Sequence, residues 1–272
     1  MAAATAGFTL GIRPVSSLRP HEMTIQRHVK ELVQEILRDG VQKDPIIIDR
    51  ETATVLDGMH RLAAFQELGV ENAVCCAVDY SSRAIALGRW ARAYTPSQAG
   101  SIHDVLGSVE SARRTTLAEA FSALERREVA VAVLTSDVAY IVGRPPQEEV
   151  GAVMLAFDRI AEQLGWERRF VPEDDIDIEL QERRRVVLLP RKLMKDDVVA
   201  AARSGKLFPC KTSMHAIDPR PVSVQFPVSE LGRATSEGLR VRLKGGEGRL
   251  SPPGSMYEGR RYKERLLFLD QR

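Results

Sequence analysis

The sequence is poor in features that mark several classes of protein. It contains three cysteines, Cys75, Cys76 and Cys210, and no pair has the Cys-x-x-Cys spacing of a zinc or redox site. An odd number of cysteines so arranged argues against a disulfide framework and predicts reduced, mostly buried thiols. No apolar run approaches the roughly 18 residues that a membrane span needs.

An excess of one charge sign is also missing. The 39 Lys and Arg residues against 37 Asp and Glu residues leave a net charge of +2. This balance does not indicate a nucleic-acid or membrane partner, although a local basic patch would escape the count. Residues 1–11 lack the basic start and apolar centre of a signal peptide, so we expect a cytoplasmic protein.

What is present is typical of a soluble globular protein. The composition is 44% hydrophobic and 28% charged, without internal repeats or low-complexity tracts. Because 272 residues exceed the ~100–200 of one domain, we expect two modest domains or one elaborated α/β unit.

Hydrophobic periodicity predicts alternating helices and strands. Residues 24–38 form an amphipathic pattern, with Thr24 as a possible N-cap and Gly40 as the stop. Two short strands, a helix that starts after Asp57-Gly58 and a third strand are predicted at residues 45–49, 54–56, 60–68 and 73–80. Strand material, a long helix, a charged surface segment, a strand and a helix follow at residues 129–142, 146–165, 168–185, 186–190 and 196–204.

The turn from Asp57 to Arg61 is the first candidate site. A strand that runs through this turn directly into a helix presents the helix-start N–H groups and the helix dipole to an anion. The planar fork of Arg61 suits phosphate, and Asp57 could hold a divalent cation that phosphates also bridge. The same residues also fit an ordinary turn, with His60 and Arg61 solvated.

Two further candidates lie far apart in the sequence. Glu22 precedes the first predicted helix, where a carboxylate could act as a base or could simply favour the helix start by about 0.3–1 kcal/mol. A late segment carries a Lys, two hydroxyls and a His that can bind phosphate and carboxylate groups, or that form a polar surface loop. Those residues are Lys211, Thr212, Ser213 and His215.

The order of these motifs is similar to that in the ParB/sulfiredoxin superfamily, and more closely to that in its free serine kinase branch. A Pro-His-Glu start, a strand into Asp-Gly-x-His-Arg, a Val-Asp-Tyr strand followed by a Trp, and a late Gly-Lys-x-Phe-Pro-x-Lys-Thr-x-x-His segment recur there. Here they are residues 20–22, 57–61, 78–80 with Trp90, and 205–215. The resemblance covers residues 18–95 and 186–228 well and the remainder loosely.

The resemblance implies an α/β (α+β) fold. Residues 1–95 would form a ParB/sulfiredoxin-like nucleotide-binding domain and residues 96–272 a C-terminal α/β domain, of which residues 205–228 return to the active site. The implied activity is transfer of a phosphoryl group from ATP or ADP to the hydroxyl of free L-serine, giving O-phospho-L-serine with Mg²⁺ present.

The resemblance also implies roles for single residues. Glu22 would be the general base, and Asp57 would be catalytic and the metal ligand. The implied nucleotide and phosphate contacts are Gly58, Met59, His60, Arg61, Lys211, Thr212 and Ser213. Trp90 and His215 would contact the serine, although Trp90 alone fits an ordinary core or interface aromatic equally well.

Some positions depart from the family pattern. Met214 stands where relatives usually carry Arg, which leaves the acceptor open between serine and another hydroxylated amino acid. Cys210 stands where Pro is common. Met59 stands where the kinases often have another His. Sulfiredoxins place their reactive Cys inside this turn, and Met59 cannot be that nucleophile, which argues against sulfiredoxin activity.

One alternative function stays open at this point. The chain could be a ParB-like, nucleotide-responsive regulator that binds DNA or a partner protein. Its basic runs at residues 183–185 and 260–265 are short and are not set in a helix-turn-helix pattern, so they favour solvated faces. The sequence does not choose between ATP and ADP, or between a monomer and a homodimer.

Overall fold

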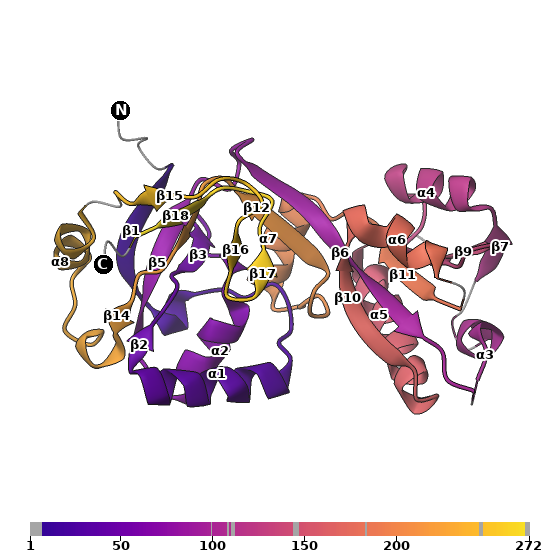
Figure 1. Ribbon diagram of the computed structural model, residues 1–272, viewed down its shortest axis with the longest axis horizontal. Coiled ribbons are helices and arrows are strands. Elements are labelled where there is room, and N and C mark those ends of the chain that lie inside the picture. Colours follow the sequence, from indigo (N-terminus) through magenta and orange to yellow (C-terminus); the bar gives the residue numbers. More distant parts are fainter. Residues whose placement is uncertain are drawn as a thin grey trace. The chain divides into compact units, whose positions relative to one another are not determined.

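The computed structural model describes residues 7–98, 100–107, 109, 112–143, 147–182, 184–244 and 247–269. It is 34% helical and 32% strand, which confirms the mixed α and β class. Contacts divide the chain into two compact units, both discontinuous in sequence (Figure 1). Unit 1 comprises residues 1–86, 198–207 and 215–272, and unit 2 comprises residues 87–197 and 208–214. No helix in the described ranges is long and apolar enough to cross a membrane.

Along the chain, the first passage from unit 1 to unit 2 is therefore between Ala86 and Leu87. The division into residues 1–95 and 96–272 stays a prediction about domains.

Unit 1 is built on a four-stranded sheet with the order β1-β5-β3-β4. β3 and β5 are parallel, and the other neighbours are antiparallel. The strands are β1 (Phe8–Pro14), β3 (Ile46–Asp49), β4 (Val55–Asp57) and β5 (Asn72–Val78). Both faces of β5 are covered, which explains its unbroken apolar sequence.

Strand β5 also carries the two adjacent cysteines, Cys75 and Cys76. Cys75 and Cys76 are buried and form no disulfide, as predicted, and Cys210 is half-buried. Burial raises the pKa of the Cys75 thiol to about 12 and holds that of Cys76 well above its usual range. These two thiols therefore act as small apolar core side chains.

One face of the sheet is covered by α1 (Gln26–Asp39) and α2 (Met59–Glu67) (Figure 1). Gly40 ends α1 in the left-handed conformation at φ 67°, as predicted. The prediction for Thr24 is wrong, because the cap position is Ile25 and no side chain caps the helix. Instead, the Ile25 N–H donates to the ring of His60, so a tertiary contact fixes where the chain enters α1.

The C-terminal segment covers the opposite face of the sheet (Figure 1). The elements are β13 (Arg220–Val222), β15 (Arg249–Leu250) and β18 (Leu266–Phe268) in one small sheet, β14 (Phe226–Pro227) paired with β2 (Val41–Gln42), the β16 (Met256–Tyr257) and β17 (Arg260–Arg261) hairpin, and α8 (Ser236–Arg242). Short 3-10 turns lie at Val15–Ser17 and Val228–Glu230. α7 (Lys195–Ser204) ends before Gly205, as predicted.

Unit 2 has a second sheet, ordered β10-β6-β11-β8-β9-β7, and β12 pairs with β6. The strands are β6 (Ile85–Thr95), β7 (Arg113–Thr115), β8 (Val131–Leu134), β9 (Ala139–Val142), β10 (Glu167–Pro172), β11 (Val186–Pro190) and β12 (Ser213–Ile217). The helices are α3 (Ile102–Gly107), α4 (Leu117–Glu125), α5 (Gln147–Gln163) and α6 (Ile176–Gln181).

The charged segment 168–185 was expected to run over the surface, and most of its described residues are indeed exposed or half-buried, although the segment also forms regular structure. It contains strand β10, a 3-10 turn at Glu173–Asp175 and helix α6. Val171 and Ile176 enter a hydrophobic core, and Glu179 is also buried, where it forms an ion pair with Arg169. The frequent charges masked a periodicity that rests on few apolar residues.

Candidate active site

The Asp57–Arg61 turn has the predicted strand–turn–helix structure. β4 ends at Asp57, Gly58 takes φ 97°, and α2 begins at Met59. The backbone at φ 97° favours glycine, and a Cβ on Gly58 would lie 3.0 Å from Nη2 of Arg61 and displace that guanidinium. The backbone N–H groups of the first helical turn have no partner inside the helix, as at every helix start.

Asp57 is held between two guanidinium groups. Its Oδ2 lies 3.5 Å from Nη2 of Arg61 and 3.1 Å from Nη1 of Arg220 on β13. The second contact is an ion pair outside hydrogen-bond geometry. Arg220 is itself fixed, because Nε donates to Glu264 at 2.7 Å and Nη2 to the His215 carbonyl at 2.5 Å. Because the Asp57 side chain is 39% exposed, its charge stays accessible to a ligand.

Arg61 is tied to the protein as well as to the turn. Nη2 donates to the carbonyl of Pro45 at 2.9 Å, and Nη1 lies 3.8 Å from Oδ2 of Asp44. Within the described part of the chain, its Nε has no hydrogen-bond partner. These contacts hold Arg61 beside Asp57, and its predicted phosphate contact stays a prediction.

His60 joins the turn to the start of α1. Its Nε2 accepts the backbone N–H of Ile25 at 3.0 Å. Because Nε2 accepts, Nδ1 is the nitrogen that carries the ring proton in the neutral form. The predicted donor role toward phosphate therefore falls to Nδ1 alone.

Glu22 lies on a segment that runs beside β4. Arg19 bridges Thr54 in parallel register, and the Val55 N–H donates to the Arg19 carbonyl at 2.9 Å. The Nδ1 of His21 then bonds the Val55 carbonyl at 2.7 Å. Glu22 is thus held between the His21–Val55 bond and the Ile25–His60 bond, both of which anchor it to β4 and the α2 start. Only 6% of Glu22 is exposed.

His215 lies in the same unit, against residues that precede α1 and follow β5. Its Nε2 is 2.7 Å from the Tyr80 hydroxyl, and its ring meets that of His21 edge-on at 5.4 Å. His21 in turn places Nε2 3.7 Å from Oε1 of Glu22. Unit 1 therefore brings the predicted base and the predicted serine contact to one buried histidine.

The other predicted contacts belong to unit 2. The Lys211 ammonium lies 4.8 Å from the centre of the Trp90 ring. The backbone N–H of Trp90 donates to the backbone carbonyl of Thr212 at 3.3 Å. Thr212 is fully buried, with its hydroxyl donating to the Pro209 carbonyl at 2.7 Å, and Ser213 is buried beside it. These bonds shape the loop, and its contact with substrate stays a prediction.

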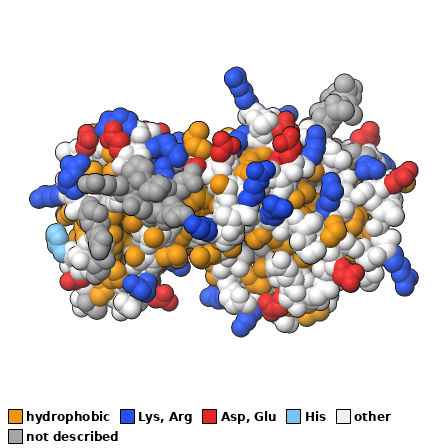
Figure 2. Space-filling view, turned by 180° about the vertical axis from the view of Figure 1, so that it is seen from behind, with side chains coloured by type: hydrophobic (Ala, Val, Ile, Leu, Met, Phe, Trp, Pro, Cys, Tyr) orange, Lys and Arg blue, Asp and Glu red, His pale blue; other side chains and the backbone are white. Residues whose placement is uncertain are grey.

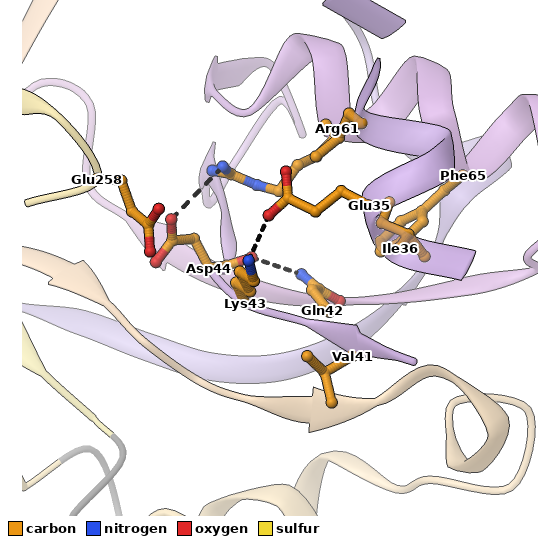
Figure 3. A pocket seen from close by; sticks show the side chains of 10 residues that line it. Glu35, Ile36, Val41, Gln42, Lys43, Asp44, Arg61, Phe65 and Glu258 are labelled. Atoms are coloured by element: carbon orange, nitrogen blue, oxygen red, sulfur yellow. Dashed lines mark hydrogen bonds and ion pairs between the residues drawn. The ribbon is translucent and has the colours of Figure 1, made fainter. Parts of the chain in front are cut away.

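A small cavity that Arg61 helps to line lies within unit 1 (Figure 3). Its volume is about 170 Å³, below the roughly 300–1,000 Å³ of pockets that enclose drug-sized ligands, so it does not hold a whole nucleotide. Lys43 pairs there with Glu35. The lining residues are Leu32, Glu35, Ile36, Val41, Gln42, Lys43, Asp44, Arg61, Phe65 and Glu258.

A resident metal site is not built from the described residues, which contain no group of three His, Cys, Asp or Glu able to hold an ion. Mg²⁺ commonly keeps several waters and uses one or two carboxylates together with substrate phosphates. Asp57 offers one accessible carboxylate to an ion that is shared in this way with bound phosphates.

Sequence reasoning did not single out Arg220, and it treated His21 and Tyr80 only as letters of a motif. Arg220 is a charged residue between two prolines in an apolar segment, which is the one local signal it offered. Its partners Asp57 and Glu264 lie far away in sequence, so no local pattern could pair them.

Sequence comparison relates the chain to two kinds of protein. No family model matches it. The ParB-like protein of Sulfolobus acidocaldarius is 38% identical over 89 residues, which are 33% of this chain and 43% of that protein, so the match spans less than half of that relative. The ADP-dependent L-serine kinase of Thermococcus kodakarensis is 21% identical over 225 residues, or 80% of this chain and 90% of the kinase. An ATP-dependent L-serine kinase of Desulfurococcus mucosus is 24% identical over 233 residues, or 80% and 89% of the two chains.

Solved structures support the same relationship at the level of fold. A glutamate-to-alanine mutant of a free serine kinase, in complex with AMP, matches with a TM-score of 0.71 and 20% identity, covering 85% of this chain and 97% of that one. In sequence and in fold, the chain is thus similar to the free L-serine kinases of the ParB/sulfiredoxin-like superfamily, which confirms the resemblance predicted from its motifs.

Proposed function

We propose that this chain is a free L-serine kinase that transfers a phosphoryl group from ATP or ADP to the serine hydroxyl and forms O-phospho-L-serine. The observation that carries the proposal is the placement of Glu22 in the chain segment beside the Asp57–Arg61 turn. Hydrogen bonds of the flanking residues His21 and Ile25 hold this segment there. Relatives that match over most of both chains and are L-serine kinases support the same conclusion.

The chemistry divides between the two carboxylates. Glu22 accepts the proton of the serine hydroxyl as that oxygen attacks the terminal phosphorus. The start of α2 and the guanidinium-flanked Asp57 hold the phosphates in line with the attack. Positioning and charge stabilisation contribute most of the rate in phosphoryl transfer.

Mg²⁺ would be held by Asp57 and the phosphates, and it would supply neutralisation of the charge that develops on the phosphoryl oxygens. The donor stays open between ATP and ADP, since L-serine kinases of both kinds are among the relatives. Trp90, Lys211, Thr212, Ser213 and His215 keep their predicted roles as phosphate and serine contacts. A cytoplasmic location and a monomer or homodimer also remain predictions.

The DNA-binding alternative is not favoured. The ParB-like relative matches over 89 residues, whereas two of the L-serine kinases match over 225 and 233 residues. On the face seen in Figure 2, basic and acidic side chains are interspersed, as on ordinary globular surfaces.

The test is a direct product assay. The purified chain is incubated with Mg²⁺, L-serine and either ATP or ADP, and O-phosphoserine is measured by mass spectrometry. L-threonine and L-homoserine serve as competing acceptors, because Met214 leaves the acceptor open. Product from serine with one donor supports the proposal, and no product with either donor refutes it.

Glu22→Gln tests the assigned base. The substitution keeps the side-chain size and removes the basic oxygen, so turnover should fall by about 10²–10⁴-fold while nucleotide affinity changes little. Affinity is measured by calorimetry with ADP or AMP. A Gln variant with full turnover would remove Glu22 from the mechanism.

A further inference from the structure

We propose that Arg92 is a positioning residue for Lys211, because its buried guanidinium fixes the backbone conformation from which the Lys211 ammonium meets its ligand. The inference rests on the proposed function, in which Lys211 contacts a phosphate or carboxylate group of a substrate. All of the groups that carry it belong to unit 2. It assigns a task to a residue that no sequence motif singled out.

The first observation is the backbone of Lys211. Its φ is 57°, in the left-handed region that residues with a side chain seldom adopt. Lys has no short polar side chain to stabilise this conformation locally, so surrounding contacts have to hold it. The conformation matters for the site, because it directs the side chain whose ammonium lies 4.8 Å from the centre of the Trp90 ring.

Two hydrogen bonds from strand β6 hold the loop before and after Lys211. Nη2 of Arg92 donates to the Cys210 carbonyl at 2.9 Å, and the Trp90 backbone N–H donates to the Thr212 carbonyl at 3.3 Å. The Cys210 carbonyl lies in the same peptide plane as the Lys211 N–H, so its direction helps to set φ of Lys211. Arg92 therefore acts directly on the left-handed torsion angle.

Arg92 is itself held firmly. It is 0% exposed, its Nε donates to Oδ2 of Asp158 at 3.1 Å, and its guanidinium lies 5.4 Å from the centre of the Phe170 ring. Asp158 is fixed in turn by the Tyr94 hydroxyl and by Arg168. A buried ion pair is a poor source of stability, because the desolvation of both charges offsets their attraction. Its placement against the loop therefore points to a role in setting the conformation of the loop.

Helix α5 provides a surface that matches the same loop. Gly151, Met154 and Asp158 lie on one face of the helix, since they are spaced three and four residues apart. A Cβ on Gly151 would lie 3.3 Å from Cδ of Pro209, and the Thr212 hydroxyl lies 3.8 Å from Sδ of Met154. The loop is thus packed on α5 before and after its lysine.

Arg92→Lys tests the proposal. The ammonium keeps the charge beside Asp158 but lacks the planar fork that reaches the Asp158 carboxylate and the Cys210 carbonyl together. We expect KM to rise about three- to tenfold for the substrate whose KM Lys211→Met raises, with kcat within about twofold. In a Lys211→Met background, Arg92→Lys should change that KM by less than about twofold, because the ammonium that it positions is gone.

Arg89→Lys is the matched control, because Arg89 is another buried arginine of β6. Its guanidinium donates to the Pro190 carbonyl at 2.9 Å and pairs with Glu173 and Glu125 at 3.0 and 3.1 Å. The carbonyl that it holds lies on β11, outside the loop around Lys211. This control should lose a similar amount of thermal stability and keep each KM within about twofold.

An unchanged KM in Arg92→Lys overturns the proposal, and so does an equal rise in the Lys211→Met background or in Arg89→Lys. If Lys211→Met raises neither KM, Lys211 has no substrate contact to support and the proposal also fails. Where Arg92→Lys shows no cooperative melting transition, Arg92→Gln combined with Asp158→Asn replaces it, because this variant removes both buried charges together. It should still raise the same KM at least about threefold, and an unchanged KM overturns the proposal.

The kinase function can fail separately. A wild-type chain that binds ADP and phosphorylates no amino acid refutes the proposed kinase activity. Calorimetric titrations with ADP and with L-serine then take the place of KM. A weaker affinity in Arg92→Lys that causes no further loss in the Lys211→Met background supports the positioning role, and unchanged affinities overturn it.

Discussion

The Asp57–Arg61 turn and the Lys211–Ser213 loop were assigned the same task, phosphate binding, yet they are built differently. In the turn, two guanidinium groups flank a carboxylate that is 39% exposed beside an open helix start. In the loop, the hydroxyl of Thr212 is buried and bonds the loop's own backbone. Lys211 lies against the Trp90 ring.

This difference between the turn and the loop shows which charged groups a phosphate can reach. The turn concentrates charge at a place that a ligand can reach, whereas Thr212 stabilises the shape of its loop. The ammonium of Lys211 is then the group of the loop whose charge suits a phosphate. We therefore expect substitutions in the turn to affect turnover more than substitutions in the loop.

Asp57→Asn should have the largest effect. It removes the charge between Arg61 and Arg220 and the carboxylate for a shared metal ion, so kcat/KM should fall about 10²–10³-fold. Arg220 keeps Glu264, so the free energy of unfolding should fall by only about 1–2 kcal/mol. Steady-state kinetics and urea denaturation measure the two quantities.

Asp44→Asn is the control for Asp57, because Asp44 also faces Arg61 but lies outside the turn. Its carboxylate accepts from the Tyr257 hydroxyl and from the Ser223 N–H. It should lower stability and leave turnover within a few fold. Equal kinetic losses in both variants would show that the turn has no special role.

Gly58→Ala should have an intermediate effect. The Cβ would lie 3.0 Å from the Arg61 guanidinium at a backbone φ of 97°, so it combines strain with displacement of Arg61. We expect a loss of about 2–3 kcal/mol in stability and roughly tenfold in kcat/KM. Gly69→Ala, at φ 66° with nothing within 4 Å, has only the strain and should keep full turnover. A kinetic loss in both variants would contradict the assignment.

Lys211→Met should have the smallest effect. It removes the cation over Trp90 and keeps the length of the side chain, so stability should fall by about 0.5–1 kcal/mol. KM for the nucleotide or acceptor should rise about tenfold or less, and Lys211→Arg should restore most of it. A loss of kcat comparable to that of Asp57→Asn would invert the comparison between the two regions.

Local sequence patterns predicted the elements around the turn well. α1 and α2 lie close to the predicted ranges, and Gly40 and Gly58 occupy left-handed positions that only glycine takes easily. The N-cap predicted at Thr24 is wrong. The chain enters α1 at Ile25, whose N–H donates to the ring of His60 on α2. The sequence pattern also did not indicate the strand and the helix within residues 168–185, where Val171 and Ile176 pack against distant residues.

The candidate site shows the same division. Glu22, Asp57 and His215 could be named from motif order, but the partners that hold them could not. Arg220 reaches Asp57 from β13, and His21 meets His215 from opposite ends of the chain. Contacts between residues so far apart depend on how elements pack, and packing leaves no periodic signal in the sequence.

The sequence by itself determined the apolar stripes of α1 and α2, the glycine turn at residue 58 and the identity of the ionisable groups. These follow from side-chain chemistry and from neighbours within one or two helical turns. Only the tertiary structure decided that Arg220 pairs with Asp57, that the ring of His60 accepts the Ile25 N–H, and that His21 meets His215 edge-on. The physical reason is that charge and proton affinity depend on burial and on through-space distance, which the fold sets.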